Sequence, residues 1–422
     1  MKMPNSNHPC FNIEAKHSYS RVHLPVAPKC NVQCNFCNRK YDCVNESRPG
    51  VTSSLLKPGQ AVSYLEKLNE RLNNISVIGI AGPGDPLANP KETIETIRLI
   101  KEKFPDKLFC LSTNGLNLYP YIDGLAALGV SHLTITINAV DPSVTEKIYA
   151  WVRSENQIYT NREGADLLLR NQLRCIPLLK EKGITVKINT VVIPGINDHH
   201  VSEIARKVSE LGADVMNCIP LIPTEGTAFA QLKAPDVKHM VLLRQLVKKF
   251  LPVMSHCSRC RADAAGLLGQ DLKEAIGLLQ EYTTKETEPI RKDENRKYVA
   301  VASCDGLLVN AHLGKSKSLL IYKQTPNGFK FVERRATPAI GSGDFRWIFL
   351  SNILKDCKAL LVNKAGPNPV KILNNSGIRI IKMSGLIDEG LDAVFNSKKV
   401  ETIDNSGSCQ CNCSRNDSQG CA

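Results

Sequence analysis

The chain has 422 residues, of which 42% are hydrophobic and 23% charged, proportions that exclude a disordered, collagen-like or coiled-coil protein. No stretch approaches the ~18 uncharged apolar residues of a membrane span, and the N-terminus lacks the apolar core of a secretory signal, so we expect a cytoplasmic protein with no membrane partner. The net charge of +13 comes with only 5% aromatic residues, so a nucleic-acid partner has no support beyond the charge itself. The 16 cysteines indicate metal or redox chemistry.

Strand-like and helix-like segments alternate along the first half of the chain. The expected strands are residues 22–27, 76–81, 107–112, 132–138, 185–192 and 213–219. The expected helices are residues 59–72, 91–104, 119–128, 165–182 and 201–211. Six strands that alternate with helices predict an α/β protein whose parallel sheet curls into a partial or full barrel, with a flat doubly wound sheet as the alternative.

The composition changes after the barrel region. A helical piece is expected at residues 271–279, and residues 281–297 are charged and short of apolar side chains. We expect residues 271–296 to form a linker after the first domain, residues 1–270. A second α/β pattern predicts a small three-layer domain over 297–404, with strands at 298–303, 318–322, 329–333, 359–362 and 378–381 and helices at 344–355 and 386–396. The tail, 405–422, is polar and is expected to be disordered by itself.

Three cysteines follow the first expected strand with the spacing C-x3-C-x2-C. Cys30, Cys34 and Cys37 could hold three irons of a [4Fe–4S] cluster and leave the fourth open. A zinc site would favour two CxxC pairs, and no partner pair is nearby. The spacing resembles the signature of the radical S-adenosylmethionine (SAM) superfamily, which implies a partial (βα)6 TIM-type barrel and a cluster whose open iron binds SAM.

Polar and glycine-containing segments end other expected strands. Residues 81–86 read AGPGDP and residues 112–115 read STNG, and glycines there would let the backbone approach a ligand closely. The resemblance implies that SAM is bound by residues from these segments and from the fifth strand. These are Gly82, Gly84, Asp85, Ser112, Thr113, Asn114 and Asn189. The superfamily usually carries Glu where this chain has Asp85.

Further cysteines lie outside a minimal radical SAM core. Cys257 and Cys260 are spaced to point two thiolates at one metal, whereas an isolated Cys110 would more often be a packing residue. In their order along the chain, HPC (8–10), VHLPVAPKCN (22–31), CNFCNRKYDC (34–43), NESRPG (45–50) and CSRCRADA (257–264) resemble the NifB family of nitrogenase-cofactor maturases. That resemblance implies one substrate cluster on His23, Cys43 and Cys110, another on Cys10, Cys257 and Cys260, and positioning or proton transfer by Glu46 and Arg48.

The resemblance also implies the reaction. Such enzymes fuse two [4Fe–4S] clusters, with a SAM-derived carbide and an extra sulfur, into the eight-iron NifB-co, precursor of the nitrogenase FeMo-cofactor. Residues 297–404 resemble the ribonuclease H-like NifX/NafY-type domain, with His312 as a candidate cofactor contact. The implied partners are cofactor carriers and scaffold of the NifX/NafY and NifEN types and cluster donors of the NifU/NifS type, and we expect a monomer.

Two alternatives stay open on the sequence. A different radical SAM enzyme with auxiliary clusters would share Cys30, Cys34 and Cys37 but would not need a carrier domain. A non-catalytic iron–sulfur carrier is supported only by Asp85. Cys175, Cys218, Cys304 and Cys357 are expected in the core or as spare thiols, and no role is assigned to the tail cysteines, Cys409, Cys411, Cys413 and Cys421.

Overall fold

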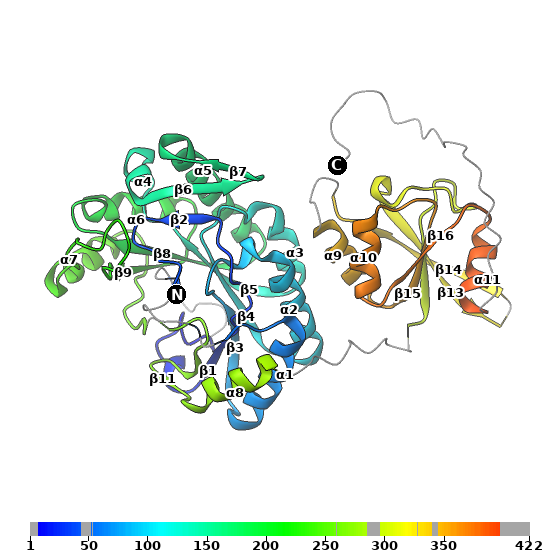
Figure 1. Ribbon diagram of the computed structural model, residues 1–422, viewed down its shortest axis with the longest axis horizontal. Coiled ribbons are helices and arrows are strands. Elements are labelled where there is room, and N and C mark those ends of the chain that lie inside the picture. Colours follow the sequence, from blue (N-terminus) through cyan, green and yellow to red (C-terminus); the bar gives the residue numbers. More distant parts are fainter. Residues whose placement is uncertain are drawn as a thin grey trace. The chain divides into compact units, whose positions relative to one another are not determined.

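The computed structural model describes residues 7–43, 52, 54–258, 260–284, 296–326, 328–339 and 345–396. It divides into two compact units, Met1–Thr287 and Glu288–Ala422, drawn from blue to green and from yellow to red in Figure 1. Glu46, Arg48 and the four tail cysteines lie outside the described residues. In the described part of the chain, no helix is long and apolar enough to cross a membrane.

An eight-stranded sheet organises the first unit, in the order β11-β10-β1-β3-β4-β5-β8-β9. Its parallel strands are β1 (Ser20–His23), β3 (Ile75–Ile80), β4 (Leu108–Thr113), β5 (Val130–Thr136), β8 (Thr185–Val192) and β9 (Val215–Pro220). These six follow in chain order without the reversal of a doubly wound sheet, and no pairing joins β9 to β1 among the described strands. The partial six-stranded barrel is therefore confirmed, and the flat doubly wound alternative is wrong.

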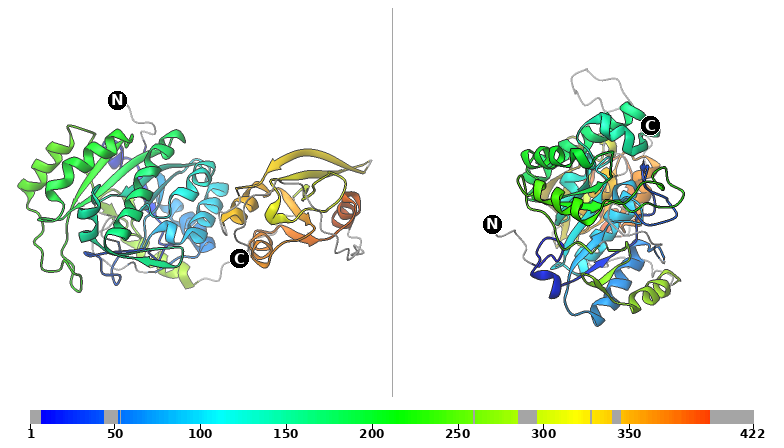
Figure 2. Two further views of the ribbon diagram at one scale, coloured as in Figure 1. Left: turned by 90° about the horizontal axis from the view of Figure 1, so that it is seen from above. Right: turned by 90° about the vertical axis from the view of Figure 1, so that its left-hand side faces the viewer.

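Helices follow the strands and lie on the outer side of the sheet (Figures 1 and 2). They are α1 (Pro58–Arg71), α2 (Pro90–Lys103), α3 (Ile122–Ala127), α4 (Pro142–Ile148), α5 (Asn161–Glu181), α6 (Val201–Glu210) and α7 (Val237–Val247). In α2, Pro90 occupies the first turn, where its missing N–H costs nothing, and Ile94, Ile97 and Ile100 form one buried stripe. The predicted apolar face of this helix is thus the face that packs on the sheet.

Smaller elements complete the first unit. A three-stranded sheet joins β2 (Val32–Cys34), β6 (Tyr149–Ser154) and β7 (Gln157–Tyr159). The antiparallel strands β10 (Ala265–Leu267) and β11 (Gln270–Asp271) extend the main sheet beside β1. Helix α8 (Glu274–Thr284) lies within the range expected to be a linker, yet it packs on α1, where the Tyr64 hydroxyl donates to the Ala275 carbonyl at 3.4 Å.

The second unit has a five-stranded sheet in the order β14-β13-β12-β15-β16. Its strands are β12 (Tyr298–Val301), β13 (Ser318–Thr325), β14 (Gly328–Ala336), β15 (Cys357–Val362) and β16 (Arg379–Lys382), and its helices are α9 (Phe345–Ile353), α10 (Pro367–Asn375) and α11 (Ile387–Phe395). Leu350 and Leu373 of α9 and α10 pack in one core cluster, while Leu391 of α11 packs in another that shares strand residues of the opposite face. This is the predicted three-layer, ribonuclease H-like arrangement.

Candidate metal and cofactor site

Small and polar side chains face the inside of the barrel. Gly79, Cys110 and Lys187 lie on β3, β4 and β8 of the sheet, with Ser112 and Asn189 two residues further along β4 and β8. Residues two apart in a strand share a face of the sheet. The apolar residues between them, such as Ile78, Leu111 and Ile188, are buried. The barrel interior is therefore built for polar contents, and its apolar packing lies on the helix side.

A cavity occupies this interior. We call it the inner cavity, and the lining residues with metal-binding or charged side chains are His8, Cys10, Arg21, His23, Cys110, Lys187, Cys257 and Cys260. The structure thus brings together all three predicted ligands of one substrate cluster, Cys10, Cys257 and Cys260, and two of the other, His23 and Cys110. Asn189, predicted at the SAM pocket, lines this cavity as well and accepts a hydrogen bond from Asn217 at 3.2 Å.

A second cavity, which we call the triad cavity, is lined by the C-x3-C-x2-C cysteines. Its lining includes Cys30, Cys34, Cys37, Cys43, Gly84, Asp85, Ser112, Thr113 and Asn114. Cys43, predicted beside His23, therefore lies on the wall of the triad cavity, and Gly82 lines neither cavity. Ser112 lines both, so the two cavities adjoin at the end of β4.

Local contacts fix the loop that carries the triad. Gln33 Nε2 donates to the carbonyls of Cys34 at 3.0 Å and Cys37 at 2.7 Å, and the fully buried Phe36 anchors the loop in a core cluster. Burial raises the pKa of Cys30 to about 11. In the absence of metal Cys30 is therefore a thiol, and a metal must displace its proton to bind.

Buried polar atoms near the triad have hydrogen-bonding capacity to spare. Ser112 Oγ and Asn31 Nδ2 are buried and find no hydrogen-bond partner among the described residues, an arrangement that is costly unless a ligand or water satisfies them. Asn114 Nδ2 donates to Asn31 Oδ1 at 2.7 Å and lies 3.8 Å from Cys30 Sγ. Three thiols beside unsatisfied polar groups fit an iron–sulfur cluster with a polar cosubstrate such as SAM next to it.

Asp85 uses its carboxylate to join the ends of two strands. It accepts from the backbone N–H groups of Leu87 and Asn114 at 2.8 and 2.6 Å and from the Thr113 hydroxyl at 2.9 Å. Ala88 N donates to the same carboxylate at 3.2 Å. The residue is 4% exposed, and burial raises its pKa. Asp85 therefore fixes the backbone that presents Asn114.

Gly84 allows this loop to lie against the chain that leads into the triad. A Cβ atom at Gly84 would lie 2.2 Å from the Lys29 carbonyl oxygen, a backbone atom that cannot rotate away. We expect Gly84→Ala to lower the free energy of unfolding by about 2 kcal/mol, measured by denaturant titration of the metal-free protein. Gly277→Ala, in α8 with open space around it, is the matched control and should be neutral or stabilising. Equal stability of the two variants would contradict the close approach at Gly84.

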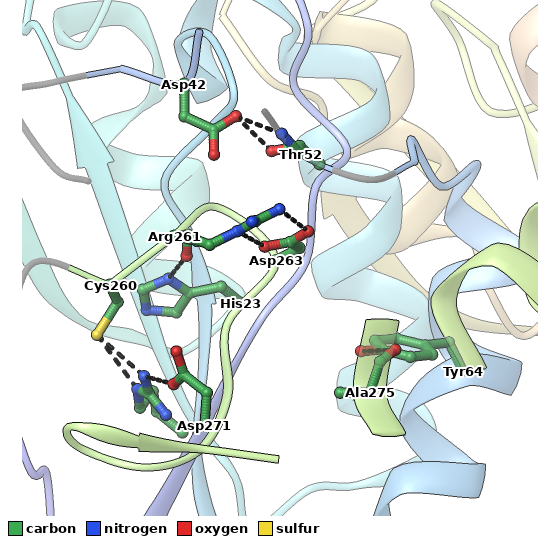
Figure 3. A network of polar contacts seen from close by, with 10 residues as sticks. His23, Asp42, Thr52, Tyr64, Cys260, Arg261, Asp263, Asp271 and Ala275 are labelled. Carbon is green, nitrogen blue, oxygen red and sulfur yellow. Dashed lines mark hydrogen bonds and ion pairs between the residues drawn. The ribbon is translucent and has the colours of Figure 1, made fainter. Parts of the chain in front are cut away.

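The hydrogen bonds of His23 suit a metal ligand. Its Nδ1 lies 3.0 Å from the Arg261 carbonyl (Figure 3), so Nδ1 carries the proton and Nε2 keeps a free lone pair, as in most metal-binding histidines. Burial, and after it the charge of Arg21, lowers the pKa of His23 to about 4, which keeps the ring neutral. Gly79 makes room for the ring, since a Cβ there would lie 2.7 Å from His23 Cδ2.

In His8 the proton is on the other ring nitrogen. Its Nδ1 accepts from the Cys10 backbone N–H at 3.1 Å, which places the proton of the neutral ring on Nε2 and makes that atom a donor. The ring lies tilted against that of His132, with 4.3 Å between ring centroids and 48° between the ring planes, and Nε2 has no hydrogen-bond partner among the described residues. Sequence reasoning missed His8, Arg21 and Lys187 as cavity residues. For Lys187 the signal was a charged residue inside an otherwise mostly apolar strand, β8.

Burial also affects thiols elsewhere in the two units. Burial raises the pKa of Cys10, Cys175 and Cys357 to about 12. No three His, Cys, Asp or Glu side chains in the described ranges converge closely enough for a single metal ion. His312 is exposed, and its Nδ1 accepts from Gly314 N at 2.9 Å, so its Nε2 is a hydrogen-bond donor.

Two family models and several curated relatives match this chain, and one relative matches it over its full length. The family model of the radical SAM superfamily matches residues 24–208, and that of dinitrogenase iron-molybdenum cofactor matches residues 295–397. A FeMo cofactor biosynthesis protein NifB from Chlorobaculum tepidum is 46% identical over 427 residues and covers 100% of both chains. NifB proteins of Klebsiella pneumoniae and Azotobacter vinelandii are 38% and 37% identical over 88% of this chain and 86% and 84% of theirs.

Solved structures are more distant. Streptococcus suis SuiB bound to S-adenosylmethionine covers 56% of this chain and 50% of its own at 16% identity, with a TM-score of 0.42, and adds nothing to the assignment. The sequence relatives and the superfamily match are sufficient, and they imply a radical SAM enzyme with a [4Fe–4S] cluster and SAM. The chain belongs to the NifB family of FeMo cofactor biosynthesis proteins.

Proposed function

We propose that this chain fuses two [4Fe–4S] clusters, with insertion of a SAM-derived carbide and an extra sulfur, into NifB-co, the eight-iron precursor of FeMo-cofactor. The observation that carries the proposal is the adjoining pair of cavities in one barrel. One contains the radical SAM cysteines, and the other contains Cys10, Cys257 and Cys260 with His23 and Cys110. A radical SAM enzyme with a small organic substrate would not need five metal-binding side chains in its substrate cavity.

The triad cavity holds the resident cofactor in this proposal. Cys30, Cys34 and Cys37 ligate one [4Fe–4S] cluster, which with SAM bound supplies the electron that cleaves SAM to a 5′-deoxyadenosyl radical. Ser112 and Asn114 offer polar groups to SAM, with Thr113, Gly82 and Gly84 shaping the backbone and Asp85 holding Asn114 in place. Because Ser112 lines both cavities, it marks where SAM would meet the substrate.

The inner cavity holds the substrates. Cys10, Cys257 and Cys260 bind one cluster, and His23 and Cys110 bind the other, completed by Cys43 from the triad side. Two sets of three ligands, rather than two closed sets of four thiolates, leave each substrate cluster open for fusion and release. Asn189 and Asn217, hydrogen-bonded to each other on the cavity wall, would donate amide N–H groups to the cluster sulfides.

Other roles are proposed beyond the two cavities. Glu46 and Arg48 would position SAM or carry protons, although they lie outside the described residues. We propose residues 1–270 as the catalytic domain and 297–404 as a domain that binds the anionic product, with His312 Nε2 as a donor to it. Carriers and scaffold of the NifX/NafY and NifEN types would receive the product from a cytoplasmic, monomeric enzyme, and NifU/NifS-type proteins would supply its clusters.

Iron and acid-labile sulfide per chain test the ligand sets. After anaerobic reconstitution we expect about twelve irons in the wild type and about four in a Cys10→Ala/Cys43→Ala/Cys257→Ala variant, because only the catalytic cluster would remain. Cys175→Ala, which removes a buried thiol of α5 that lines neither cavity, is the matched control and should keep about twelve. About four irons in both wild type and triple variant would refute the two substrate sites.

A further inference from the structure

Arg21 on β1 donates all of its hydrogen bonds to the segment that carries the last two cysteines of the inner cavity. Its Nε and Nη2 donate to Cys260 Sγ at 3.3 and 3.1 Å, and its Nη1 donates to the carbonyls of Gly266 and Leu267 at 2.6 and 3.0 Å. Nη2 also pairs with the Asp271 carboxylate. A guanidinium has five N–H donors in a rigid fork, so every one is used, and the side chain is 1% exposed.

His23 holds the same segment two residues further along β1. Residues two apart in a strand share a face, and His23 Nδ1 lies 3.0 Å from the Arg261 carbonyl, next to Cys260. Figure 3 shows Cys260, Arg261 and Asp271 gathered around His23. The backbone pairing of β1 with β10 continues this attachment, with Val22 opposite Ala265. One short strand therefore fixes both Cys260 and the chain beside it.

We infer that Arg21 is a positioning residue for the substrate cluster of Cys10, Cys257 and Cys260, an inference that rests on the proposed function. It fixes Cys260 Sγ relative to His23, a ligand of the other substrate cluster. Two clusters that must fuse need a defined separation, and a rigid link through β1 provides one. The contacts with Asp271 and with the two backbone carbonyls hold the guanidinium in place. Its two remaining N–H groups donate to Cys260 Sγ.

This arrangement also has an electronic consequence. Hydrogen bonds to a ligand sulfur raise the reduction potential of an iron–sulfur cluster and weaken sulfur as a donor. Arg21 would therefore hold the cluster in place geometrically while loosening the Fe–S bond at Cys260, which suits a substrate that must leave. A purely structural arginine would change neither the potential of the cluster nor its magnetic couplings.

Replacement by lysine tests the inference, because lysine keeps the charge and loses the fork. After reconstitution and desalting, Arg21→Lys should lose about four of about twelve irons, and any cluster that it retains at this site should titrate at a lower potential. The change in the EPR signal of the catalytic cluster on adding SAM should persist. Arg98→Lys is the matched control, since Arg98 is a partly buried arginine that pairs with Glu95 and Glu102 on α2, away from the cysteines.

A second measurement needs no variant. In wild-type protein grown with arginine labelled with nitrogen-15, pulsed EPR of the reduced substrate clusters should show coupling to an arginine nitrogen. If the wild type holds about twelve irons but shows no such coupling, the inference is wrong while the proposed function stands. The same conclusion follows if Arg21→Lys has the iron content and the cluster potential of that wild type. About four irons in the wild type itself would contradict both this inference and the proposed function.

Discussion

A Cys34→Ala variant should lose reductive cleavage of SAM while keeping its fold. Cys30, Cys34 and Cys37 are the proposed ligands of the catalytic cluster, while Cys43 on the same cavity wall is assigned to a substrate cluster. Removing Cys34 therefore leaves two ligands on a cluster with an open iron. Loss of a ligand should exceed the 10–100-fold cost of losing an outer partner of a metal site. We therefore expect 5′-deoxyadenosine formation to fall by more than about 100-fold, measured by chromatography after adding SAM and a reductant.

The control for this variant is Cys218→Ala, which removes another buried thiol, on β9, that lines neither cavity. It should keep normal SAM cleavage at a modest cost in stability. Circular dichroism of both metal-free variants separates lost chemistry from lost folding. Substantial SAM cleavage by a folded Cys34→Ala protein would contradict the assignment of the triad.

An Asp85→Ala variant should be strongly destabilised and should bind SAM poorly. Three backbone N–H groups and the Thr113 hydroxyl would lose their acceptor in a buried place, and each unsatisfied buried group costs on the order of 1–3 kcal/mol. We expect the free energy of unfolding to fall by about 3 kcal/mol or more. Since Asn114 is held by this carboxylate, the Kd for SAM of the reconstituted protein should rise at least about tenfold.

Asp85→Asn separates the two effects. The amide keeps one acceptor oxygen, so roughly half of the stability loss should return, whereas the NH2 group would face the Asn114 N–H and still disturb it. Denaturant titration and equilibrium SAM binding give the two values. If Asp85→Ala unfolds and binds SAM like the wild type, the carboxylate does not organise the loop.

The regular part of the fold was predictable because its signals are local. Strand β8 coincides with the expected residues 185–192, and helix α2 differs from its prediction by one residue at each end. The first strand was placed too late: β1 is Ser20–His23, because Pro25 and Pro28 cannot donate in a sheet. The short elements α4, β6 and β7 were missed, since their few apolar residues show no clear period.

The site was predictable in part. The C-x3-C-x2-C spacing is local and indicates its chemistry directly, but Cys10, Cys110 and Cys257 converge only through the barrel, and no spacing reveals that. Resemblance to the family supplied these ligands. It did not place Asn189, which lies on the inner cavity, or Cys43, which lines the triad cavity. The roles of Arg21 and Lys187 required knowing which face of each strand points inward.

The most direct test follows the methyl carbon of SAM. Reconstituted protein is given a reductant and SAM labelled in its methyl group, and label is measured in the iron-containing fraction, in methionine and in S-adenosylhomocysteine. Carbide insertion predicts label that travels with iron, unlabelled S-adenosylhomocysteine from the methyl donor, and 5′-deoxyadenosine from the second SAM. If 5′-deoxyadenosine forms while the label stays wholly in methionine, SAM is cleaved without methyl transfer, and the proposed cluster fusion with carbide insertion is wrong.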